Sequence, residues 1–285
     1  RDVERSRGLG DVYKRQALEF ARNRKQGHAK IDNRKGVILD HPDVRRMLIT
    51  MKSLTAAVRA LCLDAALSLD LSKSNDKQLA SKESARASFL IPIAKAFSTD
   101  IGCRVADIGI QVHGGMGYVE ETGIAQVLRD VRVTAIYEGT NGIQAIDLVG
   151  RKLADSGKAA NGLIDEIKLT ISNCSNHEDQ QIREMGTRLS KSLVCLESTL
   201  NWMLKQEDFN NRLAGATPFL QAFGMILGAN YLVKAAMKTD ELDRKSLAQF
   251  YCVNILPEME AYGVISQSGQ KSLYNFTDNF FGFSQ

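Results

Sequence analysis

The spacing of hydrophobic positions along this 285-residue chain is helical almost throughout. Apolar residues between Val44 and Leu69 recur every three or four positions, which predicts a long amphipathic helix over residues 40–71 with Asp40 as its N-cap. A second long helix is predicted over residues 79–112, with a bend near its proline. The sequence shows no strand-like alternation and only four prolines, so we expect an all-α fold.

Shorter elements surround these two helices. They are the end of a helix at 17–26, a polar linker at 28–40, a short helix at 122–130 and an extended segment at 132–139. A further helix should begin at Thr140 or Asn141 and reach Leu153. Four more amphipathic helices with short connections predict an antiparallel bundle, at residues 163–174, 178–206, 211–238 and 241–266.

A stretch of small and polar residues at 155–162 predicts a boundary between two helical domains. The first domain would cover residues 17–154 and the second residues 163–285, each with apolar faces sufficient for a core of its own. Residues 1–16 fit neither domain, because they lack a helical period and the character of the chain changes at Ala17. We interpret them as a non-native leader.

Composition argues against several classes of function. Charged residues make up 25% of the chain and the net charge is +4, without the clustered basic face of a nucleic-acid-binding protein. The sequence contains no apolar run that approaches the length of a membrane span, which is about 18 residues. The five cysteines are odd in number and widely spaced, which indicates reduced thiols in a cytoplasmic protein. Neither they nor the four histidines show the spacing of metal ligands.

Two segments carry candidate chemistry. The glycine-dense stretch from Gln111 to Tyr118 interrupts a helix and lets the backbone approach a ligand, although such a stretch alone is more often a simple helix break. Its glycine spacing and the absence of a preceding strand argue against a dinucleotide fingerprint. The second segment contains Glu138, whose neighbours Tyr137 and Gly139 predict a partly desolvated, approachable carboxylate, as a general base requires.

Three segments, in this order, resemble the C-terminal helical domain of the acyl-CoA dehydrogenase family: Phe20 to Gly27, Gln111 to Glu121 and Arg129 to Ile143. The motif Glu-Gly-Thr-Asn-Gly-Ile-Gln from Glu138, with an extra C-terminal helical domain, resembles one subgroup. This subgroup includes the methylmercaptopropionyl-CoA dehydrogenases and the larger bacterial fatty acyl-CoA dehydrogenases. The resemblance implies a four-helix-bundle-type domain and a second helical bundle, in a chain that lacks the family's N-terminal helical and middle β-domains.

The resemblance implies that Glu138 is the catalytic base of an FAD-dependent reaction. Glu138 would remove the α-proton of an acyl-CoA thioester while a hydride passes from Cβ to N5 of FAD, and Gly139 would lie against the substrate. FAD contacts carry over residue by residue. They are Arg24 and Gln26 at the pyrophosphate, Thr140 and Asn141 near the flavin, and Gln111, Val112, His113, Gly114 and Gly115 at the adenosine side across a subunit boundary.

The same resemblance implies partners and leaves two alternatives open. The partners are an acyl-CoA substrate, an electron acceptor such as an electron-transfer flavoprotein, and further copies in a homodimer or homotetramer. An acyl-CoA oxidase would use the same base and flavin but pass its electrons to oxygen. A helical scaffold module would keep the fold without chemistry, although it would have no use for the carboxylate of Glu138.

Overall fold

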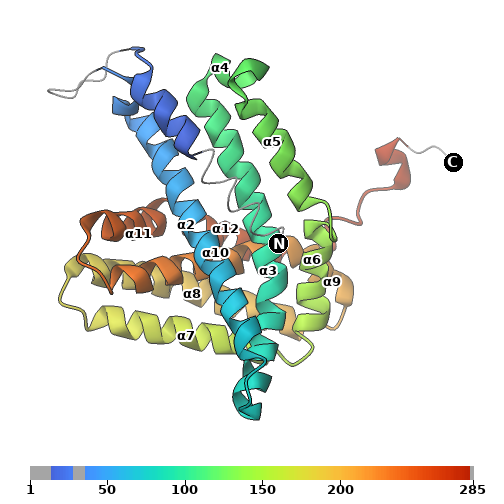
Figure 1. Ribbon diagram of the computed structural model, residues 1–285. Helices are drawn as coiled ribbons and strands as arrows, with labels where there is room; N and C mark the ends of the chain where they lie inside the picture. The colour runs from blue at the N-terminus through green and yellow to red at the C-terminus, as the bar shows by residue number, and fades with distance from the viewer. Residues whose placement is uncertain (1–13, 28–35, 283–285) are drawn as a thin grey trace.

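The computed structural model describes residues 14–27 and 36–282. Within these residues the secondary structure is helical, apart from one isolated antiparallel bridge between Lys25 and Val37. The predicted all-α fold is therefore confirmed (Figure 1). The first helix includes residues 14–16, which the sequence had assigned to a leader, and residues 1–13 lie outside the described residues.

Two long helices, α2 (Pro42–Leu71) and α3 (Lys77–His113), lie side by side and form the centre of the first half of the chain (Figure 1). The N-cap of α2 is His41 and not Asp40, because Asp40 closes the short 3-10 helix η1 (Ile38–Asp40). Helix α3 begins where the Asp76 carboxylate accepts hydrogen bonds from two backbone N–H groups. It continues without interruption through Pro92.

Short helices follow α3: α4 (Gly115–Tyr118), η2 (Glu120–Thr122), α5 (Ile124–Arg132), η3 (Val133–Ala135), α6 (Asn141–Asp147) and the π-helical turn η4 (Leu148–Lys152). The extended segment predicted over 132–139 is wrong in its first half, because α5 runs directly into η3. Val131 and Ala135 are buried while Val133 between them is 54% exposed, which fits the period of a helix and not the alternation of a strand. Only residues 136–140 form a non-helical link.

The second half contains α7 (Lys158–Ser175), α8 (Gln180–Lys205), α9 (Phe209–Ala214), α10 (Ala216–Ala236), α11 (Leu242–Asn254), α12 (Glu258–Ser266) and η5 (Asp278–Phe281). Two of the helices predicted here are each divided in two. The first division is at Gly215, where a Cβ would lie 2.2 Å from the carbonyl oxygen of Ser266. The second precedes Pro257, which has no N–H to continue the helical ladder.

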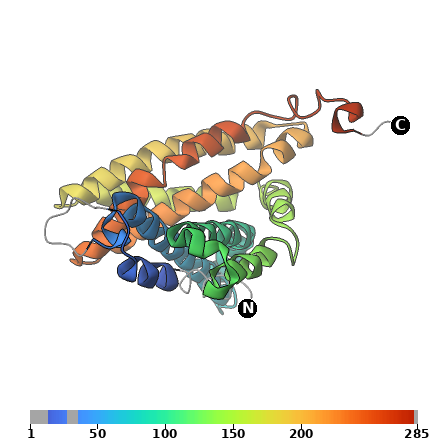
Figure 2. The same ribbon diagram turned by 90° about the horizontal axis from the view of Figure 1, so that it is seen from above.

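Helix α7 begins inside the predicted domain boundary, because the Asp155 carboxylate accepts hydrogen bonds from the N–H groups of Lys158 and Ala159. The C-terminal helices form a layer that runs across α2 and α3 (Figure 2). Buried side chains from both halves form one connected cluster, from Ala17 to Met259 in the described chain, where two separate cores had been expected.

Helix α10 lies at the centre of this common core and packs against α2, α3, α6, α8, α11 and α12. Two of its glycines permit close approach to its neighbours. A Cβ at Gly224 would lie 2.4 Å from the Phe97 ring, and one at Gly228 would lie 2.6 Å from the Tyr251 hydroxyl. Tight packing on several sides explains why α10 is apolar around most of its circumference.

Helix α10 also corrects the prediction that no apolar run reaches the length of a membrane span. Among the described residues, Ala216–Ala236 is long and apolar enough by length and composition, but 83% of its most apolar window is buried inside the molecule. Packing within the protein therefore accounts for its apolar character.

An ion cluster joins four helices away from this centre. The Arg86 guanidinium in α3 contacts the carboxylates of Asp64 in α2 and Glu166 in α7, at 2.8 and 2.9 Å. Tyr231 in α10 donates a hydrogen bond to the same Asp64 carboxylate. The cluster ties both halves of the chain together through charge-assisted hydrogen bonds.

Candidate active site

The non-helical link between η3 and α6 holds Glu138 in an unusual backbone conformation. Its φ is +54°, and that of Gly139 is +84°. Glu138 and Ser156 are the non-glycine residues with positive φ in the described chain. Such a conformation costs about 1–3 kcal/mol and persists only where surrounding contacts impose it, most often at functional sites.

Side chains from α3 and α6 supply those contacts. The Lys95 ammonium donates to the carbonyl of Gly139 and to Oδ1 of Asn141, each at 2.8 Å. The Gln144 amide donates to the carbonyl of Glu138 at 3.2 Å. Thr140 is the N-cap of α6, and its hydroxyl accepts from the N–H of Ile143. The carbonyls of Glu138 and Gly139 are therefore held by donors from the Gln144 and Lys95 side chains.

Asn141 is directed toward α3, where its amide donates to Oδ1 of Asp100 at 2.7 Å and to the Thr99 hydroxyl at 2.9 Å. The second oxygen of Asp100 accepts from Gln221 of α10 at 2.6 Å. The Asn141 side chain thus packs against α3 beneath the turn, and its place near the flavin, which the resemblance implied, stays a prediction.

The electrostatics of this network follow from its partial burial. Burial lowers the pKa of Lys95, against the opposing attraction of Asp100 and Glu138. Burial likewise raises the pKa of Asp100, although hydrogen bonds from Asn141 and Gln221 and the nearby cations Arg132 and Lys95 oppose this shift. Glu138 itself is exposed in this chain, so the partial desolvation expected from Tyr137 and Gly139 is not present here.

A second group of predicted residues lines a different cleft, of about 630 Å³. The cleft brings together Arg24, Gln26 and the stretch Gln111 to Gly115, from segments far apart in the sequence. Phe20 stacks on the His113 ring with centroids 4.5 Å apart, and the Gln26 carbonyl lies 2.8 Å from Nε2 of His41. These contacts join the first helix to α2 and to the end of α3.

The chemistry of this second cleft fits the phosphate and sugar end of a dinucleotide. Arg24 is exposed and supplies a positive charge, while Gln26 and Gln111 supply exposed amides. Gly114 and Gly115 have open space where a Cβ would point, so the backbone there is accessible to a ligand. Val112 and His113 are buried, and the His113 ring lies 2.7 Å from the Gly109 carbonyl, so these two residues form the wall.

The structure does not bring the two groups together. Lys95, beside the Glu138 turn, and Gln111, in the cleft, lie sixteen residues apart on the same helix. At a rise of about 1.5 Å per residue, this separation is about 24 Å along α3. One end of a ligand therefore cannot contact both the Glu138 turn and the cleft of Arg24 and Gln111. Each is a distinct part of the candidate site.

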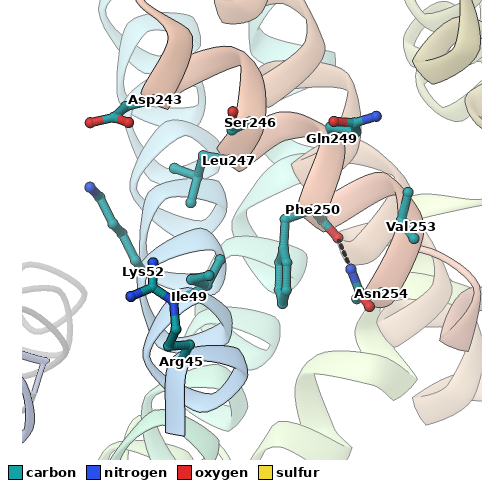
Figure 3. A pocket seen from close by; sticks show the side chains of 10 residues that line it. All are labelled: Arg45, Ile49, Lys52, Asp243, Ser246, Leu247, Gln249, Phe250, Val253 and Asn254. Atoms are coloured by element: carbon teal, nitrogen blue, oxygen red, sulfur yellow. Dashed lines mark hydrogen bonds between the residues drawn. The ribbon is translucent and has the colours of Figure 1, made fainter. Parts of the chain in front are cut away.

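A further hollow of about 720 Å³ lies between α2 and α11, and no residue predicted from the sequence lines it (Figure 3). Arg45, Ile49 and Lys52 form its α2 side, and Phe250 projects from α11 opposite Ile49. This hollow is separate from both groups described above.

Sequence reasoning missed the α3 residues that support the Glu138 turn. Lys95 and Thr99 lie four positions apart, so one face of a predicted helix carries both, and that spacing was available in the sequence. What was not available was the identity of the segment that this face contacts.

Comparisons with known proteins connect these features to a family. A family model described as acyl-CoA dehydrogenase, C-terminal domain, matches residues 9–153, and one described as acetyl-CoA dehydrogenase C-terminal like matches residues 163–277. The chain belongs to the acyl-CoA dehydrogenase family. The first match begins at residue 9, inside the leader that the sequence suggested. It also includes the Glu138 turn and the cleft of Arg24.

Among the relatives of this chain is 3-methylmercaptopropionyl-CoA dehydrogenase of Ruegeria pomeroyi. It is 36% identical over 240 residues, which cover 82% of this chain and 41% of the relative. Caenorhabditis elegans ACDH-11, solved with C11-CoA, has a TM-score of 0.75 at 20% identity, covering 97% of this chain and 46% of that one.

A Bacillus anthracis acyl-CoA dehydrogenase solved with FAD has a TM-score of 0.67 at 19% identity, covering 92% of this chain and 46% of that one. At these identities the two solved structures support the fold alone. The chain spans less than half the length of each of the three proteins.

Proposed function

We propose that the full-length protein dehydrogenates an acyl-CoA thioester between Cα and Cβ, with Glu138 as the base and FAD as the cofactor. The observation that carries this proposal is the strained turn at Glu138, which four side chains fix within a segment that matches the family. A solvated surface acid needs no such support, because strain at an unconstrained position relaxes.

The chemistry of this chain's own residues follows from the turn. The Glu138 carboxylate takes the α-proton, and the electron pair left at Cα forms the new double bond as a hydride leaves Cβ. FAD, when bound, accepts that hydride. The thioester oxygen needs a hydrogen-bond donor as the α-carbon loses its proton. The backbone N–H of Glu138 is available for this role, since it donates to no other described residue.

The cleft of Arg24 and Gln111 is the part of this chain that would hold the phosphate and adenosine end of FAD. The guanidinium of Arg24 can pair with pyrophosphate oxygens, and the open backbone at Gly114 and Gly115 can approach the ligand. The separation of this cleft from Glu138 supports a site in which each copy contributes the two groups to different FAD molecules.

A dimer or tetramer is supported by apolar side chains left exposed around the Glu138 segment. Near this segment, Val133, Ile136, Ile143 and Ile146 are at least 42% exposed, and Met116 and Tyr118 of α4 are similarly exposed beside the Arg24 cleft. Exposed apolar side chains that gather near a candidate site often belong to an interface. The family's other domains and a second copy would cover this face.

The electron acceptor of the full-length protein would be a protein such as an electron-transfer flavoprotein.

The decisive experiment is Glu138→Gln in the full-length protein, with anaerobic stopped-flow measurement of flavin reduction by acyl-CoA. The amide keeps the shape of the side chain but cannot accept the α-proton, so we expect FAD to stay bound and reduction to fall by more than about 100-fold. The matched control is Glu121→Gln, which neutralises an exposed glutamate of a neighbouring segment and should leave the rate unchanged.

Reduction of the Glu138→Gln variant within a few-fold of the parent rate would overturn the role of Glu138 as the base. The scaffold alternative would be favoured if acyl-CoA failed to reduce the flavin of the parent protein as well. The oxidase alternative is separated by the second half-reaction. The reduced flavin of a dehydrogenase should react slowly with oxygen, whereas rapid reoxidation in air would identify an oxidase.

A further inference from the structure

We propose that Gln221, in the C-terminal helix α10, is a positioning residue for Glu138 and acts through Asp100 and Asn141. This inference rests on the proposed function of Glu138 and adds a role in the chemistry for the C-terminal helices. We call the chain Gln221–Asp100–Asn141 the brace of the turn.

The first link of the brace joins the two halves of the protein. Nε2 of Gln221 donates to Oδ2 of Asp100 at 2.6 Å, across 121 residues of sequence. Gln221 is only 8% exposed, so its amide has little access to water that could replace this partner. Hydrogen bonds from an amide to a carboxylate are short and about twice as strong as those between neutral groups.

The second link joins Asp100 to the turn. Its other oxygen accepts from Asn141 at 2.7 Å, so Gln221 and Asn141 occupy different oxygens of one carboxylate. With Asp100 held by Gln221, the Asn141 amide has a fixed acceptor. Oδ1 of Asn141 then faces Lys95, which also donates to the Gly139 carbonyl.

The brace therefore fixes the position of Asn141, where the turn leads into α6. Asn141 is the first residue of α6 and follows Glu138 by three positions, so the orientation of its side chain sets the path of the backbone between them. Because Glu138 is held at a φ of +54°, loss of a contact below the turn lets the backbone relax and moves the carboxylate. A displacement of about 1 Å from a remote change can slow a reaction about 100-fold.

Packing gives the brace its rigidity. Helix α10 contacts both α3 and α6 directly, so the three helices that carry Gln221, Asp100 and Asn141 form one packed unit. Gln221 hydrogen-bonds to Asp100 and not to the turn itself, which is why it is a positioning residue and not a catalytic one.

The test is Gln221→Leu in the full-length FAD-loaded enzyme, which removes the amide donor while keeping a side chain of similar size. We expect flavin reduction to slow by about 10- to 100-fold, with the KM for acyl-CoA and the FAD content changed less than about twofold. The matched control is Gln249→Leu, which removes an amide hydrogen bond from Gln181, also 2.6 Å long, between α8 and α11. That control should leave the reduction rate unchanged.

A rescue experiment separates positioning from general stability. Gln221→Glu places a carboxylate against Asp100 and should slow reduction through repulsion. Adding Asp100→Asn exchanges donor and acceptor: the new amide at position 100 can donate to position 221 and still accept from Asn141. We expect this double variant to recover most of the rate lost in Gln221→Glu.

Three results would overturn the brace. They are an unchanged reduction rate in Gln221→Leu, an equal slowing of reduction in the control Gln249→Leu, and a double variant no faster than Gln221→Glu alone. Failure of the brace is distinct from failure of the proposed function. If only the brace is wrong, Glu138→Gln still slows flavin reduction by more than about 100-fold. If the proposed function is wrong, Glu138→Gln leaves reduction close to the parent rate.

Discussion

At the scale of single residues, Glu138 shows how a side chain gains a role from contacts that its own sequence neighbours do not provide. Tyr137 and Gly139 were expected to desolvate the carboxylate, yet Glu138 is exposed in this chain. The turn is set instead by the Lys95 ammonium and the Gln144 amide, which act on backbone carbonyls. The desolvation that a general base requires would then have to come from groups outside this chain, such as those of a second copy.

The cleft of Arg24 gives a prediction about flavin retention in the full-length protein. Arg24→Ala or Gln111→Ala should weaken FAD binding about 10- to 100-fold, the usual effect of losing a hydrogen bond to a charged group. The helical circular dichroism signal should not change, because both side chains are exposed. The control is Arg22→Ala, an exposed arginine of the helix that ends at residue 23, which does not line the cleft. Equal loss of helicity and flavin would contradict a ligand contact.

The thiol of Cys252 gives a second prediction at this scale. Burial raises its pKa to about 12, and the thiolate is the form that reacts with alkylating reagents. At pH 8 only about one thiol in 10⁴ is ionised, so iodoacetamide should leave Cys252 unlabelled until urea unfolds the protein. Peptide mass spectrometry measures this directly. Labelling of native Cys252 as fast as that of free cysteine would show that the site is open to solvent.

At the scale of secondary structure elements, the helices agree best with the sequence where a local signal marks their ends. Asp76 and Asp179 accept hydrogen bonds at the N-termini of α3 and α8, close to the predicted positions. The divisions at Gly215 and before Pro257 were missed, because helical periodicity continues across them. At Gly215 the decisive contact comes from Ser266, some fifty residues later in the chain.

The ion cluster that joins α2, α3, α7 and α10 leads to a prediction about stability. Arg86→Met leaves the carboxylate of Asp64, whose side chain is 20% exposed, without its charged partner. We expect the free energy of unfolding to fall by about 3 kcal/mol, at the lower end of the range for broken buried pairs because Glu166 is 36% exposed. Urea denaturation measures the change. Arg46→Met, which breaks an exposed pair with Asp43, should cost less than about 1 kcal/mol, and equal costs would contradict the argument.

At the scale of the whole molecule, the two halves of the chain share one core through α10. The sequence divided the chain into residues 17–154 and 163–285, and the family matches at 9–153 and 163–277 have similar limits. In the structure, buried side chains from both parts nevertheless form a continuous cluster. The two parts should therefore unfold together in a single transition.

This shared core predicts the behaviour of residues 14–285 expressed alone. They should fold as a helical protein, because the connected core lies within them, yet lack dehydrogenase activity and hold FAD weakly. The Glu138 turn and the Arg24 cleft would each have protein on one side only, so water would reach the flavin and the developing enolate. Dye reduction with acyl-CoA is the measurement. Turnover at the rate of the full-length protein would mean that the active site is complete within this chain.

The amino-acid sequence by itself determined the features that depend on neighbouring residues. These are the all-α fold, the two long helices, most helix starts and the family to which the Glu138 motif belongs. Periodicity and capping act within one or two turns of helix, so they can be recognised without knowing the rest of the fold.

Only the tertiary structure decided which residues support that motif and how the two halves join. Asn141 and Asp100 are 41 residues apart in the sequence, and Gln221 and Asp100 are 121 apart. Their hydrogen bonds depend on how α3, α6 and α10 pack, and many pairings of polar side chains are compatible with the same helical pattern. The single core has the same origin, because burial around most of α10 follows from the arrangement of its neighbours and not from its own sequence.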